Sequence, residues 1–220
     1  MSAERRSAIR AVLFDLDGTL VDTAPDLALA LNRLRLECNR PPLPFEQIRP
    51  QVSNGAAAMV RVGFGLRPGQ TGYRELRQRF LHLYLAEICR DSRLFPGLEA
   101  VLEELTARNL PWGIVTNKPG FLTTPLLAAL ALESRVTVCG DTLPVKKPDP
   151  APMHHAAGIL KLPPEACLYI GDHERDIVAA RAANMPSLGA TWGYLDGERA
   201  PADWGADALI ARPEDVLEWL

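Results

Sequence analysis

The pattern of apolar and polar residues along the chain alternates between two forms. Short, wholly apolar runs are typical of strands buried on both faces, and longer segments with apolar residues every three or four positions are typical of amphipathic helices. Strands that alternate with helices predict an α/β fold, in which helices cover both faces of a parallel sheet. The expected strands are residues 11–14, 112–116, 135–139, 167–171 and 206–210, and the expected helices are 96–109, 150–161, 174–184 and 213–220.

One region breaks this alternation. Residues 25–93 contain three helical patterns, at 27–38, 55–62 and 73–89, and no convincing strand. Prolines separate the first two patterns, as expected where helices end. We therefore expect a small helical cap domain of residues 23–93, inserted after the first strand into a core domain made of residues 1–22 and 94–220.

Composition excludes several classes of function. The 220 residues carry a net charge of -3, which argues against a nucleic-acid surface, since that would require a basic patch. The longest apolar stretch, residues 126–132, is far too short to span a membrane. The four cysteines form no C-x-x-C pair and have no zinc-ligand spacing, which fits a reduced, cytoplasmic protein. Monomer and homodimer both stay open.

The candidate chemistry follows the expected strands. In an open parallel sheet, ligands bind at the carboxyl ends of the strands, and those ends meet at one edge. Polar residues follow four of the five strands in this sequence. In chain order they are Asp15 and Asp17, Thr116 and Asn117, Lys147, and then Asp172 with Asp176.

These residue types suit a phosphate ester. The carboxylates would repel one another and a phosphate dianion unless a hard cation such as Mg²⁺, which prefers oxygen ligands, lay between them. Hydroxyl, amide and ammonium groups at Thr116, Asn117 and Lys147 can donate to phosphoryl oxygens. An aspartate beside a metal can act as a nucleophile and form an aspartyl-phosphate. Gly18 permits the tight turn that the backbone needs around such a site, and it is expected to contact the substrate there.

Four ordered segments, DLDGTLVDT, TNK, KKPDP and GDHERD, resemble the motifs of the haloacid dehalogenase-like hydrolase superfamily, and the resemblance covers nearly the whole chain. It implies a Rossmann-like core with an inserted cap. It makes Asp15 the nucleophile and Asp17 the general acid/base, with Thr116 and Lys147 holding the phosphoryl group. Mg²⁺ would be held by the carboxylates of Asp15 and Asp172 and the main-chain carbonyl of Asp17, with Asp176 supporting the metal through water.

Other chemistries within this resemblance are less favoured. Asp17 is absent from the dehalogenases, so its presence favours phosphoryl transfer. Phosphonatases need a cap lysine, and residues 25–93 contain none. A non-catalytic phosphate sensor on this fold would be expected to lack an acidic position or the lysine, and all are present. The expected substrate is a small-molecule phosphate ester.

The substrate itself stays open. Size and cap position resemble the phosphoglycolate phosphatase group, whereas VSNGAAAMV and GDHERDI resemble the N-acetylmuramic acid 6-phosphate phosphatases of peptidoglycan recycling. Both substrates are phosphomonoesters that carry a carboxylate.

The cap has one distinctive stretch, residues 48–60. Its Ser-Asn-Gly at 53–55 predicts a turn and a helix N-cap. A functional interpretation places Asn54 over the leaving group and has Arg49 or Arg61 reach a substrate carboxylate.

Three further residues are expected to have no role in the chemistry. The K-P-x-P pattern selects Lys147 over its neighbour Lys146, and Lys118 is expected to be a surface charge. His173 follows Asp172 directly and is expected to be solvated.

Overall fold

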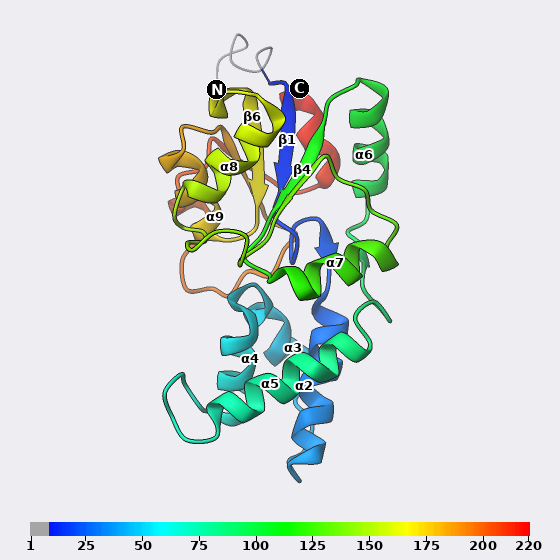
Figure 1. Cartoon of the computed structure of the whole chain (residues 1–220), viewed down its shortest axis with the longest axis vertical. Coiled ribbons are helices and arrows are strands. Elements are labelled where there is room, and N and C mark those ends of the chain that lie inside the picture. Colours follow the sequence, from blue (N-terminus) through cyan, green and yellow to red (C-terminus); the bar gives the residue numbers. More distant parts are fainter. Residues whose placement is uncertain (1–8) are drawn as a thin grey trace.

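The computed structural model describes residues 9–220, and its core is a six-stranded parallel sheet in the order β5-β4-β1-β6-β7-β8 (Figure 1). This confirms the Rossmann-like α/β fold. β1 lies inside the sheet because both its faces are apolar, and it pairs with β4 and β6. The strands are β1 (Ala11–Phe14), β4 (Trp112–Val115), β5 (Val136–Val138), β6 (Cys167–Gly171), β7 (Ser187–Ala190) and β8 (Ala208–Ile210).

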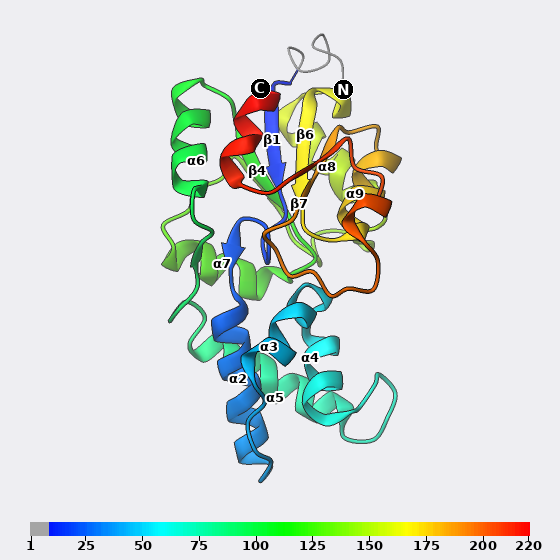
Figure 2. The ribbon, with the colours of Figure 1, turned by 180° about the vertical axis from the view of Figure 1, so that it is seen from behind.

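Helices cover both faces of this sheet. Val12 and Phe14 point from β1 into a large cluster with α6 (Leu98–Ala107), α7 (Gly120–Ala129) and the C-terminal 3₁₀ helix η4 (Pro213–Trp219). Ala11 and Leu13 point to the other face, toward α8 (Ala151–Leu160) and α9 (Glu174–Ala182). The C-terminal helix (red) lies in front of β1 when the molecule is seen as in Figure 2.

The sequence pattern missed strand β7 and helix α7 in the core. β7, Ser-Leu-Gly-Ala, lacks the β-branched residues of the other inner strands, and it forms because β6 and β8 pair with it on either side. α7 carries Pro125 within the helix, which hides its helical pattern. The helix expected at 213–220 is instead the 3₁₀ helix η4.

The cap leaves and rejoins the core at one point. β2 (Val21–Asp22) and β3 (Arg93–Leu94) pair antiparallel, with Asp22 opposite Arg93. The domain boundaries at 23 and 93 stay a prediction, which this pairing supports; residues 1–8 of the first core segment lie outside the described residues. Between β2 and β3 lie α2 (Ala24–Glu37), α3 (Phe45–Ile48), the 3₁₀ helix η1 (Arg49–Asn54), α4 (Gly55–Phe64) and α5 (Tyr73–Ala86), which we call the cap.

The two connections between cap and core are tied together by a buried carboxylate. Asp26, near the start of α2, is 2% exposed. One of its oxygens accepts a bond from the main-chain N–H of Asp91 (2.9 Å), and the other accepts from the N–H and hydroxyl of Ser92 (2.9 and 2.6 Å). The outgoing and returning segments are therefore held side by side, and the cap lies over the carboxyl ends of the strands (Figure 1).

Candidate active site

A cavity of about 300 Å³ lies between the cap and the carboxyl ends of the strands. The structure brings most of the expected site residues to it. Those that line the cavity are Asp15, Asp17, Thr116, Asn117 and Lys147 from the core and Asn54 from the cap. Two expected substrate-binding residues, Gly18 and Arg49, lie outside it.

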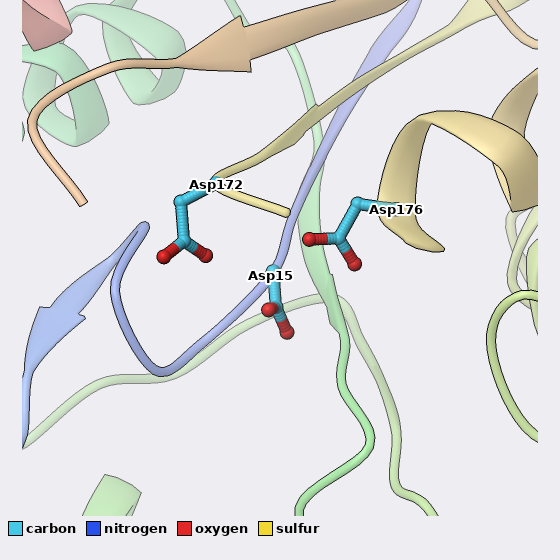
Figure 3. Close-up of side chains that lie close together, drawn as sticks. All are labelled: Asp15, Asp172 and Asp176. Carbon is cyan, nitrogen blue, oxygen red and sulfur yellow. The ribbon is translucent and has the colours of Figure 1, made fainter. Parts of the chain in front are cut away.

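Three aspartates form an acidic cluster at the inner end of this site. Asp15 follows β1, Asp172 follows β6 and Asp176 lies in the first turn of α9, so three neighbouring elements bring carboxylates close together (Figure 3). One oxygen from each lies within 4.8 Å of the others. Asp172 is 1% exposed and Asp176 is fully buried.

The cluster is electrostatically costly. Burial, followed by the charges of Asp15 and Asp176, raises the pKa of Asp172 to about 7. Burial also raises the pKa of Asp15 to about 6, although Lys147 opposes the shift. Within the described residues, Asp15 Oδ1 and Asp176 Oδ1 are buried, and the ammonium group of Lys147 is the one cation that lies within ion-pair distance of both. Buried carboxylate oxygens that converge in this way suit a hard divalent cation, so the residues fit Mg²⁺.

Lys147 is the cation that faces this cluster. Its ammonium group lies 2.9 Å from Asp15 and 2.7 Å from Asp176, and it donates to the carbonyl of Val115 (2.8 Å) and the hydroxyl of Tyr169 (2.7 Å). Burial works against its charge, but the two carboxylates outweigh burial and raise the pKa of Lys147. Its neighbour Lys146 is exposed, so the two lysines occupy different environments.

Asp17 is held away from the acidic cluster. Its Oδ1 accepts bonds from the hydroxyl of Thr23 (2.5 Å) and from the ammonium group of Lys118 (2.8 Å). The carboxylate therefore lies at the cavity wall and does not join the other three aspartates. The contact of the Asp17 main-chain carbonyl with a metal stays a prediction.

Lys118 is not a surface charge, and that expectation was wrong. It is 8% exposed, and besides Asp17 its ammonium group donates to the hydroxyl of Tyr84 on α5 (3.0 Å) and lies 4.6 Å from that ring's centre. Burial lowers its pKa, but the charge of Asp17 and then Tyr84 outweigh burial, so the pKa of Lys118 is raised. Asp17 lies 101 residues earlier in the chain, so no local pattern announces this pair.

Thr116 and Asn117 follow β4 and line the cavity. Thr116 is 4% exposed and lines the cavity, where its hydroxyl accepts the N–H of Lys118 (3.1 Å). Asn117 donates its amide to the main-chain carbonyl of Lys147 (2.9 Å). Asn117 Oδ1 is buried and has no partner among the residues that the structure describes. Asn117 thus positions the loop that carries Lys147.

Gly18 acts through close packing, and the expectation that it contacts substrate is not supported. It has φ +89°, and a Cβ there would lie 2.2 Å from Asp172 Oδ2. Glycine is needed both for the left-handed backbone and for the approach of the carboxylate. The next residue, Thr19, donates its hydroxyl to Asp172 Oδ1 (3.2 Å). The loop after β1 therefore fixes Asp172.

The cap loop reaches the acidic cluster directly. Ser53 donates its hydroxyl to Asp172 Oδ2 (2.9 Å), and Asn54 donates its amide to Asp196 (2.9 Å). The expected N-cap is wrong in detail: Asn54 lies at the N-cap position of α4 but makes no capping bond in this described segment, because its side chain bonds to the core instead. Arg175 of α9 donates to the carbonyl of Ser53 (2.9 Å) and to Asn54 Oδ1.

His173 is part of this contact between cap and core and is not fully solvated, contrary to expectation. Its side chain is 20% exposed, and Nδ1 accepts bonds from the main chain and side chain of Arg175 (both 3.2 Å). Burial and the charge of Arg175 lower the pKa of His173 to about 4.

Arg49 does not face the cavity, so its expected contact with a substrate carboxylate is not supported. Its guanidinium donates to the carbonyls of Gly193 (3.2 Å) and Trp192 (3.3 Å) and lies 4.9 Å from the centre of the Tyr194 ring. Arg61 bonds to Gln51. The arginines that line the cavity are Arg77 and Arg175.

Tyr194 links the acidic cluster to the start of the cap. Its main-chain N–H donates to Asp172 Oδ2 (2.9 Å), and its hydroxyl donates to Asp22 (2.6 Å). The same hydroxyl accepts the main-chain N–H groups of Thr23 (2.7 Å) and Ala24 (2.9 Å). The sequence offered no motif for this residue, because its partners lie about 20 and 170 residues away.

Comparison with known proteins places the chain in a family. Residues 9–184 match the family model for haloacid dehalogenase-like hydrolases. The chain belongs to this family. The match confirms the resemblance carried by the four motifs.

Named relatives align over almost the whole chain. A phosphoglycolate phosphatase of Xanthomonas campestris pv. campestris is 43% identical over 211 residues, covering 95% of each chain. An N-acetylmuramic acid 6-phosphate phosphatase of Pseudomonas aeruginosa is 38% identical over 218 residues, covering 98% of this chain and 96% of the other. A crystal structure of a predicted phosphoglycolate phosphatase from Haemophilus somnus superposes with a TM-score of 0.84 at 29% identity, covering 96% of this chain and 97% of that one. Family and relatives together indicate a phosphatase.

Proposed function

We propose that this protein hydrolyses small phosphomonoesters with Mg²⁺, through a phosphate transiently bound to Asp15. The observation that carries the proposal is the cluster of Asp15, Asp172 and Asp176 beside Lys147, where Asp15 and Lys147 line the cavity beneath the cap. A phosphate dianion can enter such a site only if the carboxylate charge is balanced, which the lysine does in part and a divalent cation would complete.

The reaction assigned to these residues has two steps. A carboxylate oxygen of Asp15 attacks phosphorus, the ester P–O bond breaks, and its electron pair leaves with the alcohol oxygen, which takes a proton from Asp17. Water then attacks phosphorus and gives a proton to Asp17, and the bond to Asp15 breaks. The second step restores both aspartates and releases inorganic phosphate.

Mg²⁺ would be held by Asp15, Asp172 and Asp176, together with the main-chain carbonyl of Asp17. When bound, it supplies positive charge that stabilises the charge on the transferring phosphoryl group. The direct or water-mediated contact of Asp176 stays a prediction.

Polar side chains beside the acidic cluster complete the phosphate site. Thr116 and Lys147 line the cavity near Asp15 and can donate to phosphoryl oxygens. Asn117 holds the Lys147 loop in place. Lys118 keeps Asp17 directed at the cavity wall, where a leaving alcohol would receive its proton.

Two substrates stand as candidates. The relatives at 43% identity are named phosphoglycolate phosphatases, which favours 2-phosphoglycolate. The relative at 38% identity is named for N-acetylmuramic acid 6-phosphate, which is the second candidate. Both fit the mechanism, because the core residues act only on the phosphate.

The direct test is phosphate release from p-nitrophenyl phosphate with Mg²⁺ present or chelated. Wild-type protein should release phosphate only with the metal, and Asp15→Asn should release none. Asp203→Asn, which makes the same chemical change at an exposed position, is the matched control and should behave as wild type. If Asp15→Asn retained wild-type turnover, the nucleophile assignment would fail. If wild-type protein bound the ester without turnover, a non-catalytic sensor would be the better account.

Location and assembly stay predictions. Among the helices of residues 9–220, none combines the length and apolar character that a membrane crossing requires. The cytoplasmic location rests on the scattered cysteines, which the structure describes as free thiols. Monomer and homodimer both stay open.

A further inference from the structure

Helix α5 presents one face to the cavity. Arg77, Phe80, Leu81 and Tyr84 all line it, and their spacing of three, four and seven residues puts them on one side of a helix. This face is the cap wall opposite the core residues. Its residues therefore meet the part of a substrate that lies beyond the phosphate.

The two ends of this face lie at different depths. Tyr84 bonds to Lys118, which in turn bonds to Asp17, so this end lies beside the catalytic carboxylates. Arg77 lies seven residues earlier on the helix, a separation of about 10 Å at about 1.5 Å per residue. Arg77 thus marks the end of the cavity far from the reacting phosphate.

Arg77 is a cation without a protein partner in the described part of the chain. No hydrogen bond, ion pair or ring contact is formed by its guanidinium within residues 9–220, and its side chain is exposed while lining the cavity. Arg79, two residues on, is by contrast paired with Glu37 through two bonds of 2.6 and 2.8 Å. An arginine that faces a ligand cavity and is free to bind is well suited to a carboxylate.

The cavity wall between Arg77 and Tyr84 is apolar, which favours a substrate whose middle part is uncharged. Phe80, Leu81 and Met59 provide apolar surface, and the small residues of 55–57 leave room beside them. A cavity of about 300 Å³ falls at the lower end of the range for drug-sized ligands, about 300 to 1,000 Å³. The carboxylate of 2-phosphoglycolate, separated from its phosphate ester by a single methylene, would stay at the inner end.

We propose that the cavity takes a sugar-sized phosphomonoester that bears a second anionic group, and that Arg77 binds this group about two helical turns from the phosphate. The inference rests on the proposed phosphatase function and narrows its substrate class. Arg77 is thereby a specificity-determining residue of the cap. Arg49, bound to the core, is not available for this contact.

The test compares two esters that differ only in the remote anion. N-acetylmuramic acid 6-phosphate carries a lactyl carboxylate, and N-acetylglucosamine 6-phosphate lacks it. Wild-type protein should prefer the first in kcat/KM. Arg77→Ala should reduce that preference about 10- to 100-fold, the effect of losing a charge-assisted hydrogen bond, mainly through a higher KM for the carboxylated ester. Arg77→Lys should recover part of the preference, and Arg79→Ala should keep all of it.

Binding to Asp15→Asn separates the inference from the proposed function. Calorimetry of both esters with this variant, and with the Asp15→Asn, Arg77→Ala double variant, measures recognition without turnover. If wild-type protein hydrolysed none of the esters but binding of the carboxylated ester still depended on Arg77, the proposed function would be wrong and the inference would stand. Equal selectivity of Arg77→Ala and Arg79→Ala in both assays, or a wild-type preference for 2-phosphoglycolate, would overturn the inference.

Discussion

Replacing Lys118 with methionine removes the charge that faces Asp17 while keeping a side chain of similar length. In the native protein the two groups are 2.8 Å apart, and the side chains of Lys118 and Asp17 are 5% and 16% exposed, so solvent screens the pair only weakly. Removal of one partner from a buried ion pair costs about 3–5 kcal/mol, because the other charge stays buried without compensation. Asp17 keeps its bond from Thr23 and touches the cavity, so we expect the lower end, about 3 kcal/mol.

Thermal unfolding and turnover both report this change. For a chain of this size, about 1 kcal/mol corresponds to about 2–4 °C, so the Tm of Lys118→Met should fall by about 6–12 °C. Positioned acid–base groups contribute about 10²- to 10⁴-fold to rates, so an Asp17 freed from Lys118 should lower kcat by about 10-fold or more. Circular dichroism in Mg²⁺ buffer gives Tm, and phosphate release gives kcat.

The matched control is Lys161→Met, the same substitution at an exposed lysine of the core. Surface substitutions of this kind change stability by about 0.5 kcal/mol or less. If Lys118→Met had the Tm of the control and the kcat of the wild type, the ion pair with Asp17 would contribute nothing to stability or to catalysis, and the reasoning would be refuted.

Three further predictions concern the backbone, the acidic cluster and the cap connections. Gly18→Ala should destabilise the protein by about 2–4 kcal/mol, since a Cβ lies 2.2 Å from Asp172 Oδ2 at φ +89°; Gly197→Ala, at φ +75° with no described atom within 4 Å of its Cβ, should cost only about 1 kcal/mol in the same unfolding assay. Burial raises the pKa of Asp15 to about 6 and that of Asp172 to about 7, from an unfolded value of 3.8. Without metal, the folded state therefore binds protons more tightly than the unfolded state. The stability that these two groups contribute is full below pH 3.8 and is lost as the pH rises through 6 to 7. Because Mg²⁺ binds the ionised carboxylates, the gain in Tm on adding Mg²⁺ should be larger near pH 8 than near pH 5, and an equal gain at both would contradict the metal site. Asp26→Ala should cost about 3 kcal/mol in urea unfolding because three donors of the returning segment lose their acceptor, and Asp26→Asn, which keeps one carbonyl oxygen, should cost less.

The sequence predicted the positions of residues that directly follow strands. It did not predict side-chain contacts between residues far apart in the chain. Asp15, Asp172 and Lys147 could be brought together in advance because a parallel sheet gathers the carboxyl ends of its strands at one edge. Lys118 looked like a surface charge because its partner Asp17 lies 101 residues away. The hydroxyl of Ser53, 119 residues from Asp172, was equally hidden.

Side-chain direction was the other limit. The position of Arg49 in the cap suggested a contact with substrate, but the ring of Tyr194 and two main-chain carbonyls hold it against the core. Arg77 drew no attention in the sequence, because an arginine within a charged helix is typical of a solvent-facing surface. Only the packing of α5 over the core shows which of its faces meets the cavity.

The paired exit and return of the cap have a consequence for how such proteins diversify. Asp22 and Arg93 are opposite one another on neighbouring strands, so everything between them begins and ends at the same place on the core. A different insertion with the same two ends could replace the cap without changing the strand order of the sheet or moving a catalytic aspartate. Substitutions on α5 can therefore change substrate preference during evolution, while the core residues that act on the phosphate stay the same.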